Sequence, residues 1–210
     1  MILAIDSSAG TSVAIVQAGE TLIEHNSQNA RGHAEAIGTL IEACLSSLQI
    51  RPTQLEAVAV GMGPGPFTGL RVGIAAAVSF GVALGVPVLR VSSHAAIALE
   101  RQSSLGEERM LVTTDAKRRQ RYWSAFEFPG PFELPQLVLG PDISSEEQLQ
   151  VAVSNLGVFT RVDSEWVSAA SVGLLSERLQ STGGSFLGST PLYLRSPEVT
   201  IATVPKRVSQ

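Results

Sequence analysis

The chain has 210 residues and a net charge of −4, with 16% charged and 5% aromatic residues. This composition excludes a protein that binds nucleic acid by itself, because neutralising the phosphates requires an excess of Lys and Arg. Its 19 glycines and 11 prolines predict a core of small aliphatic side chains and many tight turns. The single cysteine, Cys44, excludes an intrachain disulfide and falls on the apolar face of a predicted helix, which indicates a core residue. The N-terminal residues lack the basic region of a signal peptide, which predicts a cytoplasmic protein.

The first half of the chain predicts a meander of three strands, followed by alternating helices and strands. The order is βββαβαβα, which is typical of an α/β fold. The expected elements are the strands Ile2–Ser7, Thr11–Ala18 and Thr21–Ser27, the helix His33–Leu48, the strand Leu55–Val60, the helix Leu70–Leu84, the strand Val86–Val91 and a helix from Ser93 toward Glu100.

The second half begins in the same way, with a strand that ends in an aspartate and is followed by a hairpin. Because Asp6 and Asp115 occupy equivalent places, the pattern predicts a duplicated βββαβα unit. The expected elements are the strands Met110–Thr114 and Arg121–Phe128, a short strand Leu137–Leu139, a helix near Ser144–Val153, a strand Leu156–Val162 and a helix Val167–Leu179.

Residues 61–71 form a glycine-rich elbow between a strand and a long helix. Gly65 is expected to cap this helix, and Pro66 to take its first position. A turn of this kind aims helix N–H groups at one spot and can hold a phosphate, but this one lacks the Walker lysine and the G-x-G-x-x-G spacing. Two interpretations stay open: contact with a nucleotide, and a structural role in setting the angle between strand and helix.

The helix after the elbow is apolar on nearly every side and carries small residues at intervals of four. Such a stripe lets another helix approach closely, so we expect a partner's helix on it and on the neighbouring helix. Arg71 opposes the helix dipole and is expected to have an acidic partner. The uncharged run 72–89 has the length of a membrane span, but Pro87 and the glycines argue against one. The expected interface residues are His33, Gly69, Leu70, Arg71, Gly73, Ala77 and Gly81.

No catalytic centre or metal site is predicted. The histidines His25, His33 and His94 lie on three different predicted elements, without an H-x-x-x-H or H-E-x-x-H pair. His94 is interpreted as a helix-start or surface residue, and His33 as a residue packed at a helix N-terminus. The basic run 117–121 is either a solvated hairpin tip or a contact for an acidic partner or RNA.

Several motifs, taken in order, resemble those of the bacterial TsaB (YeaZ) family, and the elbow block is the most specific of them. They span most of the chain. The motifs are Ile2-Leu-Ala-Ile-Asp6-Ser-Ser, His33, the Gly63-Pro-Gly…Phe67-Thr-Gly-Leu-Arg71-x-Gly73 block, Asp115-Ala-x-Arg118 before Tyr122-Trp123, and Pro191-x-Tyr193-Leu-Arg195. Two positions depart from the family pattern: Pro66 stands where the family usually has Ser, and Arg119-Gln120-Arg121 replaces a small-acidic-aliphatic hairpin tip.

The resemblance implies a two-lobed actin-like (ASKHA, RNase H-like) fold, with an N-terminal lobe over 1–100, a C-terminal lobe over 101–198 and a tail over 199–210. It also implies a non-catalytic partner of a TsaD-type subunit, with a TsaE-type ATPase, in making threonylcarbamoyladenosine next to the tRNA anticodon. The complex uses ATP, this chain alone is expected to bind no cofactor, and tRNA is reached only through the complex. Whether the isolated chain forms a homodimer stays open. TsaD-like proteins carry an H-x-x-x-H metal motif at the equivalent place, where this chain has His94 and Ala98.

In the actin-like superfamily, a carboxylate at the end of the first strand lies at the floor of the cleft. Asp6 and Asp115 are therefore either ligands for a metal-bound water or phosphate, or the first residues of Asx turns. Together with Ser7, Gly63 and Gly65 they make up the candidate nucleotide or phosphate loops. Two other functions stay open: an independent ATPase or small-molecule kinase of this fold, and a metalloprotease, as the older glycoprotease label suggests.

Overall fold

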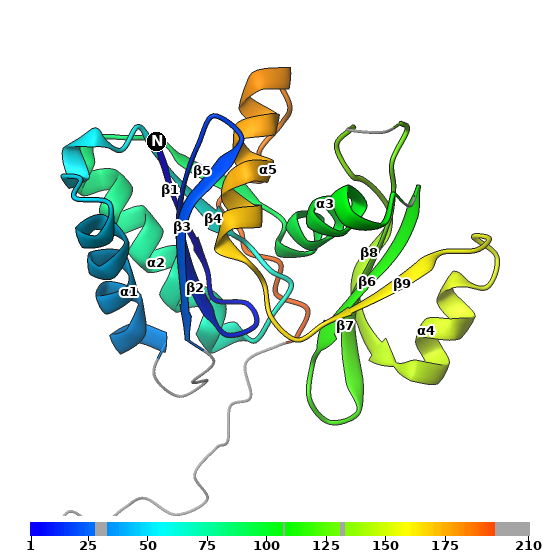
Figure 1. Ribbon diagram of the computed structural model, residues 1–210. Helices are drawn as coiled ribbons and strands as arrows, with labels where there is room; N and C mark the ends of the chain where they lie inside the picture. The colour runs from blue at the N-terminus through cyan, green and yellow to red at the C-terminus, as the bar shows by residue number, and fades with distance from the viewer. Residues whose placement is uncertain (28–32, 107, 131–132, 196–210) are drawn as a thin grey trace, which may run out of the picture.

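The computed structural model describes residues 1–27, 33–106, 108–130 and 133–195. Two sheets and their helices form two lobes side by side (Figure 1). The elements are β1 (Ile2–Asp6), β2 (Thr11–Gln17), β3 (Glu20–Ser27), α1 (His33–Ser47), the short 3-10 helix η1 (Pro52–Gln54), β4 (Ala57–Gly61), α2 (Phe67–Leu84), β5 (Val88–Val91), α3 (Ser93–Leu105), β6 (Arg109–Asp115), β7 (Gln120–Glu127), β8 (Gln136–Ser145), α4 (Glu146–Val153), β9 (Thr160–Ser164) and α5 (Ala169–Thr182).

The two sheets share one connectivity. Sheet A has the strand order β3-β2-β1-β4-β5, and sheet B has the order β8-β7-β6-β9. In each sheet the first strand in sequence pairs antiparallel with the second and parallel with the strand that follows the next helix. This repeat confirms the predicted α/β actin-like fold with a duplicated βββαβα unit.

The helices divide the molecule into layers. α1 and α2 cover one face of sheet A, α5 covers the other face, and α3 lies between α5 and sheet B (Figure 1). One apolar core extends from Ala4 of β1 and Val172 of α5 to Val112 of β6 and Phe126 of β7. α5 therefore follows sheet B in the sequence but packs on sheet A. From the sequence we expected residues 101–198 to form the C-terminal lobe. In the structure α5, the last described helix, packs instead on sheet A, which belongs to the N-terminal lobe.

The boundaries of the second half differ most from the sequence prediction. β8 has 10 residues, continues through two bulges beside β7 and ends at Ser145. Ser145 and Gln148 form a capping box, with Gln148 N donating to Ser145 Oγ and Ser145 N donating to Gln148 Oε1, so α4 begins at Glu146. The predicted helix start at Ser144 is wrong by two residues, because the bulged strand is longer than its apolar pattern indicates.

α2 meets sheet A through its smallest residues. A Cβ added to Gly73 would lie 2.2 Å from Ser7 Oγ, and one added to Gly81 would lie 2.5 Å from Val88 Cγ2. The expectation that this stripe receives a partner's helix is therefore wrong. Its backbone lies on the chain's own strands, because only residues with little or no side chain allow α2 so close to the sheet. The buried residues of α2 are Gly69, Leu70, Gly73, Ala77 and Gly81.

The other sides of α2 are apolar as well. Within the described ranges, α2 is the one helix long and apolar enough to cross a membrane by length and composition, with a mean hydropathy of 1.7. In this fold, Val72, Ile74 and Phe80 on its flanks pack against the core that α1 also covers. Val82 points outward and is 77% exposed. α2 is thus a sheet-packed helix that keeps an apolar outer surface.

We expect Gly73→Ala to lower the free energy of unfolding by about 1–3 kcal/mol, the usual cost of overpacking. The new methyl group would displace Ser7 Oγ from its hydrogen bonds with Gly69 O and Gly73 N. Gly38→Ala in α1 is the matched control, since nothing lies within 4 Å of a Cβ there. It should raise stability by up to about 1 kcal/mol through helix propensity. Urea unfolding followed by circular dichroism measures both, and equal stability of the two variants would contradict the close packing of α2.

Candidate functional site

A buried carboxylate at the end of β1 connects three segments. Asp6 Oδ1 accepts the N–H of Ser8 at 2.8 Å and its hydroxyl at 2.6 Å, and Oδ2 accepts the Ser93 hydroxyl at 2.6 Å. Ser93 Oγ in turn accepts the N–H of Gly63 at 3.1 Å. A Cβ added to Gly61 would lie 1.8 Å from Asp6 Oδ2, so only glycine fits there. The network holds together the end of β1, the elbow and the start of α3.

The surroundings of Asp6 act on its pKa in opposite directions. Burial raises the pKa of this carboxyl, while the hydrogen bonds from Ser8 and Ser93 oppose the rise. Both Ser8 donors bind the same oxygen, so the interpretation of Asp6 as an Asx-turn residue is confirmed. Donors of the chain bind both oxygens of Asp6, and its side chain is buried, which favours a structural role for this residue.

The elbow sets the start of α2 one residue later than predicted. Pro66 is the N-cap, with φ −61° and ψ 135°, and no side chain caps the helix. The Gly63–Pro64 peptide is cis, and Gly63 has φ +92°, a region that favours glycine. Gly65 lies against the first turn of the chain, since a Cβ there would be 2.9 Å from Ser8 Cα. These contacts support the structural interpretation, in which the elbow fixes the angle between β4 and α2.

The second aspartate also begins a turn. Asp115 Oδ1 accepts the Lys117 N–H at 2.8 Å, and Oδ2 binds Lys117 Nζ at 2.7 Å. The side-chain bond with Lys117 holds the pKa of Asp115 below its usual value. Lys117, Arg118 and Arg119 have φ values of 61°, 54° and 59°, so the hairpin turns tightly through three left-handed residues. Asp115 is thus a turn residue in the structure, like Asp6.

A cleft of about 650 Å³ lies between the lobes, and the two turns face each other across it. Of the predicted loop residues, Ser7 and Asp115 line the cleft, whereas Asp6, Gly63 and Gly65 are not part of its lining. The start of α2, the β6–β7 hairpin, the start of α4 and residues 164–166 complete the walls. Sequence reasoning missed the last two segments, because no motif marks them and only the return of β9 toward sheet A brings residues 164–166 there.

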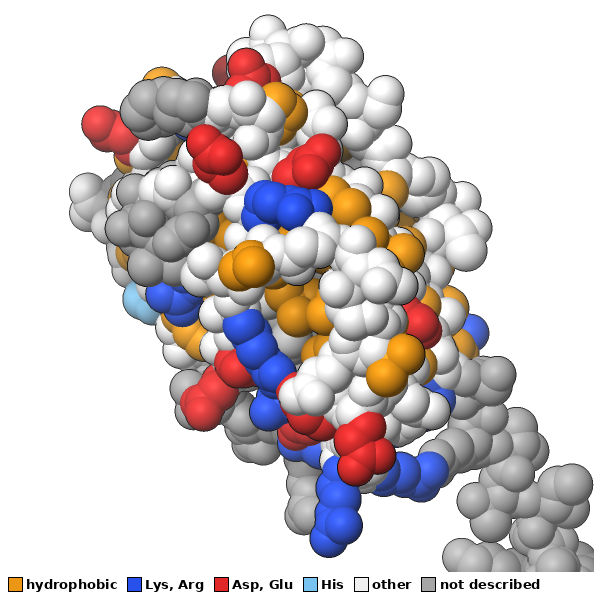
Figure 2. All heavy atoms as spheres, turned by 90° about the vertical axis from the view of Figure 1, so that its right-hand side faces the viewer, with side chains coloured by type: hydrophobic (Ala, Val, Ile, Leu, Met, Phe, Trp, Pro, Cys, Tyr) orange, Lys and Arg blue, Asp and Glu red, His pale blue; other side chains and the backbone are white. Residues whose placement is uncertain are grey.

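Several charged side chains at and beside the cleft form pairs within the chain. Besides the Asp115–Lys117 pair, Arg161 Nη2 binds Glu146 Oε2 at 3.0 Å and Asp163 Oδ1 at 3.0 Å. The bond with Arg161 holds the pKa of Glu146 below its usual value. Figure 2 shows cations and carboxylates interspersed, with blue side chains gathered at the lower end, where the β6–β7 hairpin lies in Figure 1. The hairpin cations therefore do not belong to a continuous basic surface on this side.

Arg71 stacks on two aromatic rings at the start of α2. Its guanidinium carbon lies 3.7 Å from the centre of the Phe67 ring and 6.0 Å from that of Tyr193, and its Nε donates to Tyr193 Oη at 3.4 Å. Tyr193 is held there because the Leu192 N–H donates to Met62 O at 3.0 Å. The described partners of Arg71 are aromatic, where an acidic one was expected. This cluster joins two predicted motifs 122 residues apart, a contact that neither motif indicates by itself.

His94 lies in the first turn of α3, in line with its interpretation as a helix-start residue, but it is fully buried and not a surface residue. Its Nδ1 lies 2.9 Å from Ser124 Oγ and its Nε2 lies 3.0 Å from Thr114 Oγ1. Burial lowers its pKa to about 3, so the ring is neutral at pH 7. Within the described ranges, no three His, Cys, Asp or Glu side chains converge as a metal site would need. His33 begins α1, and its side chain lies outside the described residues.

The buried neutral imidazole predicts a pH dependence of stability. The unfolded chain takes up a proton on His94 as the pH falls below 6.5, whereas the folded chain does so only near pH 3. Wild type should therefore lose up to about 1.4 kcal/mol per pH unit in that window relative to His94→Gln, which has no such proton to bind. Urea unfolding of both proteins at several pH values between 7 and 4 measures the difference. A constant difference across this range would show that His94 titrates equally in both states.

Comparisons with known proteins agree on one family. The family model for TsaD, tRNA N6-adenosine threonylcarbamoyltransferase, matches residues 24–131, which is half of the chain. The tRNA threonylcarbamoyladenosine biosynthesis protein TsaB of Haemophilus influenzae is 30% identical over 237 aligned positions, which cover 98% of both chains. The TsaB of Escherichia coli is 29% identical over 179 positions, covering 82% of this chain and 74% of that one. An uncharacterized Mycobacterium tuberculosis protein is 40% identical over 128 residues, and the chain spans 58% of its length.

A solved structure shares the fold. The crystal structure of YeaZ from Pseudomonas aeruginosa superposes with a TM-score of 0.75 over 92% of this chain and 99% of that one, at 24% identity. The covered share is large enough to include both lobes. With the family model over half of the sequence and a match to a TsaB protein along nearly its whole length, the chain belongs to the TsaB (YeaZ) family.

Proposed function

We propose that this chain is a non-catalytic partner subunit in the formation of threonylcarbamoyladenosine in tRNA, and that it binds a TsaD-type catalytic subunit. Membership of the TsaB family supports the pathway, since relatives carry this biosynthesis in their names. A TsaE-type ATPase joins the same complex, which uses ATP, and tRNA reaches this chain only through the complex. The TsaB of Haemophilus influenzae, which is matched along nearly its whole length, supports the pathway.

The observation that carries the proposal is the outer surface of α2. Only 28% of the residues of this helix are buried within the chain, although its mean hydropathy is 1.7. Val82 and Ala75 are exposed, and Val78 between them is half-buried outside the apolar cores. An apolar helix surface of this kind is more stable when another protein covers it. We assign it to the TsaD-type subunit, or to a second copy of this chain when that subunit is absent.

The cleft gives less support to independent catalysis. Asp6 and Asp115, the two carboxylates that an enzyme of this fold would use, are already bound by Ser8, Ser93 and Lys117. The N-cap of α2 is Pro66, which has no N–H to offer a phosphate. A supporting role for this chain therefore fits the geometry better than phosphoryl transfer.

Val82→Lys should weaken binding to the TsaD-type subunit by about tenfold or more, since a desolvated lysine would have no partner in an apolar contact. The chain itself should stay folded, because a cation in the last turn of a helix suits its dipole. Val151→Lys is the matched control: Val151 is 74% exposed, against 77% for Val82, and also lies in the last turn of a helix. Calorimetric titration of each variant with the TsaD-type subunit of the same organism measures the affinity, and unchanged binding by Val82→Lys would remove the assignment of this surface.

The function is tested separately from the surface. Threonylcarbamoyladenosine formation on tRNA is measured with the TsaD-type and TsaE-type subunits, with and without this chain. We expect little product when the chain is omitted. Equal product in both reactions would refute the proposed function, whichever surface of the chain makes contact.

The purified chain alone should not hydrolyse ATP at about 1 per second, the low end of ordinary enzymes. The physical reason is that both candidate carboxylates are engaged within the chain. Phosphate release is followed for the wild type and for Asp6→Asn, which keeps an acceptor for Ser8. Turnover at that rate that vanished in Asp6→Asn would instead favour an independent ATPase.

A further inference from the structure

The hairpin between β6 and β7 is strained at its tip. Lys117, Arg118 and Arg119 have φ values of 61°, 54° and 59°, a region that residues with a side chain adopt at a cost. Glycine would form the same turn without strain, yet the chain has three long cations there. Strain of this kind gathers at functional sites, where the surrounding structure holds it in place. The tip therefore indicates that its side chains serve in binding.

Arg119 is the cation of this tip that the described contacts leave available. No hydrogen bond or ion pair joins its exposed guanidinium to a described residue, whereas Lys117 is bound to Asp115. Arg119 lines the cleft between the lobes together with Arg121. A guanidinium without an acceptor in such a place suits a phosphate, which it binds through two N–H groups at once.

An aromatic side chain lies on another wall of the same cleft. Trp166 follows β9 and is half-buried, and the Ser164 hydroxyl donates to Trp166 O at 2.7 Å and so holds this turn. Trp166 and Arg119 line one cleft of about 650 Å³. A cation for the backbone and a ring for a base are the two elements with which proteins bind single-stranded nucleic acid.

The charges of the cleft favour an anion. Of the carboxylates among its described lining residues, Asp115 and Glu146 are bound by cations of the chain. Two cations, Arg119 and Arg121, then face one remaining carboxylate, Glu165. This excess suits a single phosphate contact, and it agrees with the lack of a continuous basic surface on this side of the molecule.

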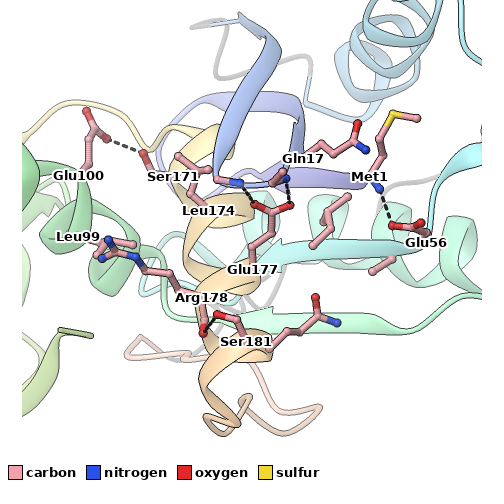
Figure 3. A pocket seen from close by; sticks show the side chains of 15 residues that line it. Met1, Gln17, Glu56, Leu99, Glu100, Ser171, Leu174, Glu177, Arg178 and Ser181 are labelled. Carbon is pink, nitrogen blue, oxygen red and sulfur yellow. Dashed lines mark hydrogen bonds and ion pairs between the residues drawn. The ribbon is translucent and has the colours of Figure 1, made fainter. Parts of the chain in front are cut away.

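The larger hollow at the other end of sheet A lacks this combination. It has a volume of about 910 Å³ and lies between α3 and α5, where Figure 3 shows its lining. Glu56, Glu100 and Glu177 line it and would repel a phosphate. The cleft is therefore the better place for a nucleic acid.

We propose that a single-stranded RNA segment crosses the mouth of the cleft in the assembled complex, with a phosphate on Arg119 and a base on the ring of Trp166. The inference rests on the proposed function, in which tRNA reaches this chain through the complex. Sequence-specific RNA recognition targets loops, whose unstacked bases are able to reach an aromatic ring. A free nucleotide fits less well, because Pro66 at the start of α2 offers no N–H to its phosphates.

The test measures tRNA binding by the complex of this chain with the TsaD-type and TsaE-type subunits, at salt concentrations from about 50 to 200 mM. Arg119→Gly removes one phosphate contact, so the slope of log Kd against log salt should fall by about 0.7, the value for a single strand. Arg119→Lys keeps the charge and should keep the slope. Trp166→Leu should weaken binding about fivefold or more at an unchanged slope, and Trp166→Phe, which keeps a ring, should weaken it less.

Stability separates this role from a structural one. Arg119→Gly should melt at the temperature of the wild type or above it, because glycine adopts a φ of 59° without strain. Ala18→Gly is the matched control, since Ala18 has a φ of 54° and lies between β2 and β3, outside the cleft. It should relieve strain in the same way and leave tRNA binding unchanged. A lower melting temperature of Arg119→Gly would assign Arg119 to the fold and overturn the proposal.

Four further results would overturn it as well. They are an unchanged salt slope in Arg119→Gly, unchanged affinity in Trp166→Leu, displacement of tRNA by AMP at about 1 mM, and weaker calorimetric binding of either variant to the TsaD-type subunit. The last result would assign these residues to a protein contact. None of them touches the proposed function, which is judged by the reaction from which the chain is omitted.

Discussion

The absence of side chains along one side of α2 is the constraint on which much of the molecule depends. At Gly73 and Gly81 the helix backbone lies on β1 and β5 with no room for a methyl group. The Ser7 hydroxyl can therefore donate to Gly69 O and accept the Gly73 N–H, which fixes the β1–β2 turn against the helix. Since the sheet receives only small residues, the larger aliphatic side chains of α2 turn to its flanks and its outer surface. The same packing that builds the core thus leaves α2 with an apolar outer surface.

Two consecutive residues at the start of α3 connect the lobes. Ser93 donates to Asp6 at the end of β1, and the ring of His94 lies between Ser124 and Thr114 of sheet B. Both contacts are buried and polar, so each holds its lobe in one orientation and would be costly to break. Ser93 and His94 therefore connect the start of α3 to both sheets.

The sequence by itself determined the order of elements and the duplicated unit, and it offered Asx turns at Asp6 and Asp115 as one of two interpretations. These features are local: alternating apolar runs, glycine-rich turns and Asx residues act within a few positions of one another. It also determined that α2 carries a stripe of small residues, but not whether this stripe packs on the chain's own sheet or on a partner. The tertiary structure decided that, since Gly73 could face a sheet or a partner with the same spacing. It also decided the burial of His94, the stacking of Arg71 on Tyr193 and the return of α5 to sheet A, because each depends on segments far apart in the chain that meet only after both sheets have formed.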